Sequence, residues 1–126
     1  MEQKVNYNQL YTSMHDFFRL KGSSIVVLTK AAVIEICKHA MDYDILIWRI
    51  ESGIWHNPGY EPRDVIDSIY DPPVSKETAI DNNLMFIKNL KDEPPEYDVF
   101  TILITNYQGL PKEHLYDKYF EKHPNN

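Results

Sequence analysis

Two strongly apolar, β-branched runs constrain the fold of this chain more than any other feature. One is DILIWRIE at residues 44–51 and the other is YDVFTILIT at residues 97–105. Each run is bounded by charged or turn-forming residues, which is typical of a buried β-strand. The chain is therefore expected to contain a sheet whose centre is made by these two strands.

The first run has apolar residues on both of its faces. Alternation places Ile45 and Ile47 on one face, and Leu46, Trp48 and Ile50 on the other. A strand with two apolar faces is usually central and covered on both sides, so Trp48 is expected to lie in the core. The residues predicted to form the centre of the sheet are Ile45, Ile47, Val99, Phe100, Ile102 and Leu103.

Four other segments carry apolar residues at the i, i+3, i+4, i+7 spacing of one helix face. The predicted helices run over residues 7–18, 30–41, 76–90 and 111–120. Thr29 and Ser75 directly precede the second and third helices and are expected to be their N-caps. In the third helix, Ile80, Leu84 and Ile87 are expected to form the buried side.

The remaining segments are shorter and less regular. Residues 25–28 are a candidate strand, residues 52–60 indicate a turn, a short strand and a sharp corner, and residues 63–70 indicate a short helix or an irregular segment. With 126 residues the chain has the length of one domain. We therefore predict an α+β fold in which residues 1–126 form a single domain, with a small sheet packed against three to four helices.

No segment has the spacing of a known catalytic or metal-binding motif. None of the 5 histidines forms an i, i+4 pair, and there is no CxxC pair and no Gly-rich phosphate loop. Cys37 lies on an apolar stripe, and His39, two residues further on, does not share its helix face, so Cys37 is expected to pack in the core. We predict no catalytic residue, no metal and no cofactor.

Three further features of the sequence bear on the cellular location of the protein. No stretch approaches the ~18 apolar residues of a membrane span. The N-terminus MEQKVNYNQLY lacks the apolar segment of a secretory signal, and the single cysteine cannot form an internal disulfide. These features favour a reduced, cytoplasmic protein with no membrane contact.

The charge is negative and unevenly distributed. Nineteen acidic residues stand against 13 lysines and arginines, a formal charge of −6, which argues against direct nucleic-acid binding. Residues 42–71 carry seven acidic residues and only two arginines, and the turn-rich part of this stretch also contains Trp55, Tyr60 and Tyr70. Trp and Tyr commonly anchor interfaces, and neighbouring acids attract a basic partner. The predicted partner-binding residues are Glu51, Trp55, Tyr60, Glu61, Asp64, Asp67, Tyr70 and Asp71.

The segment GIWHNPGYEPRD, residues 53–64, resembles the small acidic immunity proteins that bacteria pair with toxic effector domains, as in contact-dependent growth inhibition and other polymorphic toxin systems. The resemblance implies a protein that tightly binds and inhibits a cognate toxin, often a basic nuclease. It assigns no individual site residue. An inhibitor of this kind needs no catalytic groups, and an acidic aromatic surface suits a positively charged nuclease.

Two other functional classes remain open at this point. A small enzyme could assemble its site from distant residues, such as His56 with Glu61 or Asp64, and a pocket lined by convergent polar groups would indicate it. A cytosolic adaptor or homodimer could instead bury Trp55 or a C-terminal aromatic face. The acidic stretch could also be merely a solvated surface.

Overall fold

The computed structural model describes residues 4–124. Residues 1–3 and 125–126 lie outside the described part, and the predictions on the N-terminus and on the full extent of the domain fall partly on them. Within residues 4–124 the strands are β1 (Leu28–Thr29), β2 (Ile45–Trp55), β3 (Tyr60–Asp67) and β4 (Val99–Asn106). They form one antiparallel four-stranded sheet of order β1-β4-β2-β3. The predicted α+β class is confirmed. The helices are α1 (Met14–Arg19), α2 (Lys30–His39), α3 (Lys76–Lys91) and α4 (Asp117–Lys122), with 3-10 turns η1 (Ala40–Tyr43) and η2 (Lys112–His114).

The two apolar runs lie next to each other at the centre of the sheet, as predicted. Strand β2 pairs with β4, so that Ile47 faces Ile104 and Ile50 faces Ile102. All four side chains belong to the main buried cluster. Their contacts join segments about fifty residues apart in sequence, and this pairing closes the core.

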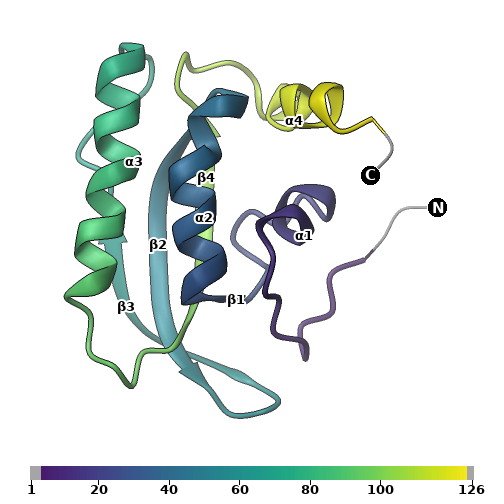
Figure 1. Cartoon of the computed structure of the whole chain (residues 1–126), viewed down its shortest axis with the longest axis vertical. Coiled ribbons are helices and arrows are strands. Elements are labelled where there is room, and N and C mark those ends of the chain that lie inside the picture. The colour runs from purple at the N-terminus through teal and green to yellow at the C-terminus, as the bar shows by residue number, and fades with distance from the viewer. Residues whose placement is uncertain (1–3, 125–126) are drawn as a thin grey trace.

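Helices α2 and α3 lie side by side across one face of the sheet, while α1 and α4 lie together beside it (Figure 1). The predicted N-caps are confirmed: Thr29 Oγ1 accepts the N–H of Ala32 at 3.3 Å, and Ser75 Oγ accepts the N–H of Thr78 at 3.1 Å. No described helix covers the opposite face of β2, β3 and β4 (Figure 1). The expectation that the central strand is covered on both sides is therefore not met, since the described helices lie across only one face.

The first helix is much shorter than predicted. It spans Met14–Arg19, with Ser13 as its N-cap, instead of residues 7–18. Tyr11 instead forms a bridge to Leu28, and its N–H and C=O bond the backbone of Val27 and Thr29 at 2.8 and 3.0 Å. The apolar periodicity was misleading because Tyr11 is buried by this edge pairing rather than by a helix turn.

The segment predicted as a corner followed by a helix or irregular chain is a long β-hairpin. Strand β2 continues to Trp55, and β3 replaces the irregular segment expected over residues 63–70. The turn closes where His56 N–H donates to Gly59 C=O at 2.7 Å, and Asn57 and Gly59 both have positive φ. Strand β3 is an edge strand, where Pro and charged residues are tolerated, and this composition concealed it.

The buried side of α3 is rotated from the predicted one. Ile80 and Leu84 are 41% and 50% exposed. The inward side instead consists of Ala79, Asn82, Asn83, Phe86 and Leu90. Two asparagines occupy the inward positions because their amides bond β2 backbone groups, an interaction that apolar periodicity does not reveal.

Trp48 is not in the core, contrary to expectation. The register of β2 against β4 shifts between Ile47 and Arg49, which leaves Trp48 as the extra residue of a β-bulge. Beyond the bulge the alternation is inverted, so Ile50 joins Ile45 and Ile47 in the core cluster, and Trp48 is 36% exposed.

The C-terminal helix also differs from prediction, since η2 and α4 replace one continuous helix over residues 111–120.

A candidate protein-binding face on the sheet

The face of the sheet turned away from α2 and α3 carries a set of side chains from three adjacent strands. We call it the open face. Residues that pair across antiparallel strands project to the same side, and Arg49 pairs with both Asp67 and Leu103. By the same register Glu51 lies between Val65 and Thr101, and Trp55 lies opposite Tyr60. The residues of the open face used below are Trp48, Arg49, Glu51, Trp55, Tyr60, Asp67, Thr101 and Leu103.

Arg49 and Asp67 form an ion pair across the open face. Arg49 Nε donates to Asp67 Oδ1 at 2.6 Å, and Nη2 donates to Oδ2 at 3.4 Å. The hydrogen bond from Asp67 and the charge of its carboxylate raise the pKa of Arg49 further above its already high ordinary value. An exposed pair of this kind contributes little to stability. Its effect is to hold the planar guanidinium in a fixed position.

Tyr60 is held flat against β2 because Gly53 leaves room for its ring. A Cβ atom added at Gly53 would collide with the Tyr60 ring and with the Glu61 carbonyl oxygen. The Tyr60 hydroxyl donates to Glu51 Oε1 at 2.9 Å. Burial, followed by this bond to the carboxylate, raises the pKa of Tyr60. Tyr60 therefore remains a neutral donor that orients Glu51.

Two shallow hollows adjoin one another on the open face. The larger, of about 400 Å³, is lined by Trp48, Arg49, Asp67, Ser68 and Leu103. The smaller, of about 160 Å³, is lined by Ser24, Arg49, Glu51, Thr101 and Leu103. Arg49 and Leu103 belong to both. One hollow therefore offers an aromatic and an aliphatic wall, and the next offers a carboxylate and hydroxyl groups.

The acidic segment after α3 folds back onto the hairpin. Residues 92–98 carry four acidic residues and no basic one. Ser52 Oγ donates to Glu93 Oε1 at 3.2 Å, and Trp55 N–H donates to Asp98 Oδ1 at 3.2 Å. These contacts bring two acidic stretches that are distant in sequence to one end of the sheet. We call Glu61, Asp64, Glu93 and Asp98 the acidic rim.

The predicted partner-binding residues divide into three groups. Four lie on the open face, namely Glu51, Trp55, Tyr60 and Asp67. Glu61 and Asp64 lie on the same hairpin but pair with Ile54 and Ser52, which puts them on the other side of the sheet. Tyr70 and Asp71 follow β3, where Tyr70 N–H donates to Ser68 Oγ at 3.0 Å. Sequence reasoning missed Trp48, Arg49, Thr101 and Leu103 because the bulge and the β2–β4 register that place them on this face are tertiary features.

The residues considered for an enzyme site are only partly brought together. His56 Nε2 lies 2.7 Å from Glu61 Oε1, and Arg63 forms an ion pair with the same carboxylate. Asp64 instead accepts the N–H of Val65 at 2.9 Å. His56 and Glu61 lie beside the hairpin turn, which extends beyond the ends of the helices (Figure 1), and neither lines either hollow. This arrangement is an exposed ion-pair cluster.

The C-terminal aromatic residues proposed for a homodimer are used inside the molecule. Tyr119 is buried and stacks on Phe18 with ring centroids 4.8 Å apart. The Tyr116 hydroxyl accepts the N–H of Ser23 at 3.2 Å. These contacts attach α4 to the rest of the protein, so the side chains are not displayed as a dimer face.

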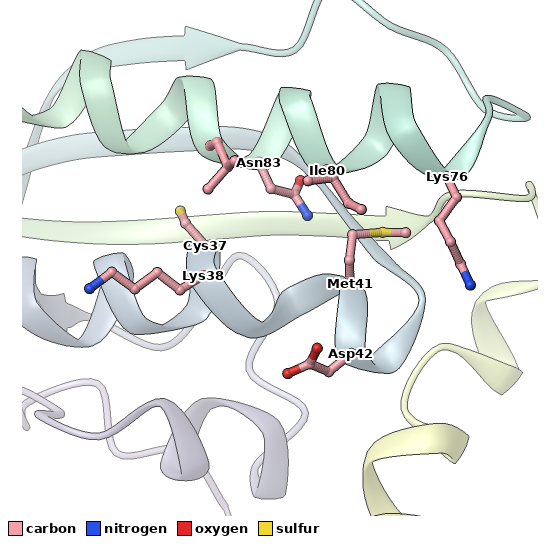
Figure 2. A pocket seen from close by; sticks show the side chains of 8 residues that line it. Cys37, Lys38, Met41, Asp42, Lys76, Ile80 and Asn83 are labelled. Atoms are coloured by element: carbon pink, nitrogen blue, oxygen red, sulfur yellow. The ribbon is translucent and has the colours of Figure 1, made fainter.

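A further groove lies between α2 and α3 on the opposite side of the molecule. It has a volume of about 300 Å³, and Figure 2 shows Cys37, Met41, Ile80 and Asn83 turned into the space between the helices. Cys37 is 2% exposed, which confirms its predicted packing in the core. Burial raises the pKa of the Cys37 thiol to about 12, so the group is a protonated core residue and not a nucleophile.

The described residues, 4–124, hold neither a candidate metal cluster nor a candidate membrane span. No cluster of three or more His, Cys, Asp or Glu side chains in this part of the chain is arranged to hold a metal ion. Likewise, no described helix combines the length and the apolar character needed to cross a bilayer.

Comparison with known proteins shows which proteins the chain is similar to. No family model matches it. It is 38% identical over 106 residues to the immunity protein CdiI of Burkholderia pseudomallei, an alignment that covers 83% of this chain and 97% of the relative. It is 34% identical over 67 residues to the colicin-E5 immunity protein of Escherichia coli, covering 52% of this chain and 81% of the relative. The colicin-E5 immunity protein in ColE9 shows the same identity and coverage.

Proposed function

The chain belongs to the family of CdiI immunity proteins, and from this premise we propose that it binds and neutralises one cognate toxin through the open face and the adjoining acidic hairpin. The resemblance of residues 53–64 to toxin immunity proteins is thereby confirmed at the level of family. The proposal extends to a single domain over residues 1–126 that acts in the cytoplasm, as a stoichiometric inhibitor without a cofactor and not as an enzyme.

The observation that supports this binding site is that the aromatic open face lies next to the acidic rim. The open face presents Trp48, Trp55 and Tyr60 on a rigid sheet, where they are available as anchors. The rim meets this face at the hairpin, where Asp98 accepts the Trp55 N–H and Glu93 accepts the hydroxyl of Ser52. Glu61 and Asp64 extend the acidic surface to the other side of the same hairpin. In tight inhibitor complexes, buried aromatic side chains slow dissociation, and acidic side chains accelerate association with a basic partner.

The distribution of charge supports a basic toxin, and we propose that this toxin is a nuclease. A nuclease holds phosphate with clustered Lys and Arg, and these remain as a positive surface when nucleic acid is absent. Eleven of the chain's 19 acidic residues lie in residues 42–71 and 92–98, and the net charge of the chain is −6. Such a surface attracts a basic site and repels nucleic acid itself.

The proposed contact residues are those that the sequence indicated, together with those that the fold adds to them. The acidic members would pair with Lys or Arg of the toxin, and the aromatic members would be covered by it. The first set is Glu51, Trp55, Tyr60, Glu61, Asp64, Asp67, Tyr70 and Asp71, to which the structure adds Trp48 and Arg49.

We expect the cognate toxin to be encoded next to the gene for this chain, and the test uses the toxic domain of that neighbour. Bacteria that express the toxin domain alone should lose viability, and co-expression of the full chain should restore it. The purified proteins should co-elute as a complex, and the toxin's cleavage of RNA or DNA should stop at one equivalent of the chain. Absence of both protection and complex formation would overturn the proposed function. A neutralised toxin that cleaves no nucleic acid would overturn only the nuclease assignment.

A further inference from the structure

Trp48 is displayed on the open face by the geometry of the central strand. Its neighbours Ile47 and Ile50 are fully buried, yet Trp48 is 36% exposed because it is the extra residue of the β2 bulge. Burying most of an exposed indole against a partner is among the largest single contributions that one residue makes to an interface.

Hydrogen bonds hold the bulge in place at Trp48 and at the residue before it. Ser68 N–H donates to the Trp48 carbonyl at 2.8 Å, and Asn82 Nδ2 donates to the Ile47 carbonyl at 2.8 Å. The Ser68 hydroxyl in turn donates to Asn82 Oδ1 at 2.7 Å, which joins these two attachments. The backbone that carries Trp48 is thus held by α3 and by the segment after β3. A side chain on such a support loses little conformational freedom when a partner covers it.

The hollow lined by Trp48 and the smaller one that adjoins it differ in chemistry. In the larger, the Trp48 ring and Leu103 provide apolar walls. In the smaller, Glu51 is the only acidic lining residue, and Thr101 and Ser24 provide hydroxyl groups. Arg49 borders both hollows, but its charge is already paired with Asp67. The smaller hollow therefore favours a cation, and the larger favours an apolar side chain.

We propose that the toxin seats two adjacent side chains here, an apolar one against Trp48 and a Lys or Arg at Glu51. This inference rests on the proposed function and identifies the anchor of the same interface. The occupant follows from charge complementarity, because Glu51 is held by Tyr60 with its carboxylate at the hollow and the nearby rim is acidic. A second copy of this chain would bring the same acidic groups against one another, which disfavours self-association through this face.

The first test measures binding kinetics with the toxin domain against which the full chain protects cells. Trp48→Ala should accelerate dissociation about 30-fold, the equivalent of roughly 2 kcal/mol for a central aromatic anchor. Trp48→Phe should retain most of the residence time. Glu51→Gln should slow association at low salt and reduce its salt dependence, because it removes one charge without removing the acceptor for Tyr60.

The matched control is Ile80→Ala, which removes an apolar side chain of similar exposure from α3 on the opposite layer. It should leave both rate constants unchanged. The inference is overturned if folded Trp48→Ala dissociates at the wild-type rate, or if Ile80→Ala weakens the complex instead. A wild-type chain that neither binds nor protects overturns the proposed function itself, so the two failures are distinguishable.

A second measurement leaves the fold intact. The chain has 2 tryptophans, so 5-fluorotryptophan labelling gives two ¹⁹F resonances, and Trp55→Phe assigns the one that belongs to Trp48. On addition of unlabelled toxin domain the Trp48 resonance should shift and lose its sensitivity to solvent. A Trp48 resonance that keeps its position and solvent sensitivity in the complex would contradict the proposal, whatever the behaviour of the alanine variant.

Discussion

The side-chain amide of Asn83 on α3 makes two hydrogen bonds to β2 of the kind that a neighbouring strand makes. Its Oδ1 accepts the N–H of Ile47 at 2.9 Å, and its Nδ2 donates to the carbonyl of Ile45 at 2.9 Å. Strand β3 pairs with β2 only from Arg49 onward, so these backbone groups have no strand partner on that side. A buried polar residue on a helix thus completes the sheet and holds the strand just before its bulge.

Asn83→Leu should therefore destabilise the protein although it makes α3 more apolar. It leaves one buried N–H and one buried C=O unpaired, and each such group costs about 1–3 kcal/mol. We expect the free energy of unfolding in urea to fall by about 2–4 kcal/mol. Asp81→Ala, at an exposed position on the same helix, should change it by less than about 0.5 kcal/mol. Equal stability of Asn83→Leu and wild type would show that the amide is dispensable.

Ile47→Ala should reduce stability through loss of packing alone. The side chain is fully buried in the cluster between the sheet and the helices, and a cavity at such a site costs about 2–5 kcal/mol. Urea titration monitored by circular dichroism measures the change. Ile69→Ala, at a position that is 76% exposed, is the control and should be nearly neutral. A similar small effect for both variants would contradict the assignment of Ile47 to the core.

Charge reversal on the hairpin should act on the rate of encounter with the toxin. Asp64→Lys combined with Asp67→Lys should slow association at low salt and weaken its salt dependence, because the lysines that replace these two carboxylates repel a basic partner. Stopped-flow mixing with the toxin domain against which the chain protects cells measures this association rate. Glu35→Lys combined with Glu77→Lys changes the net charge equally on the helix layer and should have a much smaller effect. Equal effects of the two double variants would mean that the hairpin acids are only a solvated surface.

Stability should fall in alkaline solution because of Cys37. Burial raises the pKa of this thiol from 9.0 to about 12 in the folded protein, whereas the unfolded chain ionises near the ordinary value. The unfolded state therefore releases its proton first, and stability is full below pH 9 and declines as pH rises toward 12. The expected slope is roughly 1.4 kcal/mol per pH unit from this group. Unfolding by urea at several pH values between 8 and 11 measures the slope, and Cys37→Ala should reduce it. An unchanged slope in Cys37→Ala would assign the loss to other groups, such as the buried tyrosines.

Several elements could be predicted from the sequence because their signals are local or nearly so. The apolar runs identified β2 and β4, and Thr29 and Ser75 marked the starts of α2 and α3 through the side-chain oxygens that cap them. The acidic, aromatic segment around residues 51–71 and its resemblance to immunity proteins indicated the family that the comparisons show. These features could be predicted because the residue types within a short segment are enough to favour a strand or to cap a helix.

The remaining features depended on how distant segments meet. The bulge that exposes Trp48 exists only in the register between β2 and β4, and the rotation of α3 follows from amides that complete the edge of β2. The open face likewise combines side chains from β2, β3 and β4, and residues 92–98 join the hairpin only when the chain is folded. Sequence by itself determined the two central strands, the starts of α2 and α3, and the family. Tertiary structure alone decided which side chains the open face presents, because a one-residue shift in strand pairing moves every later side chain to the other face.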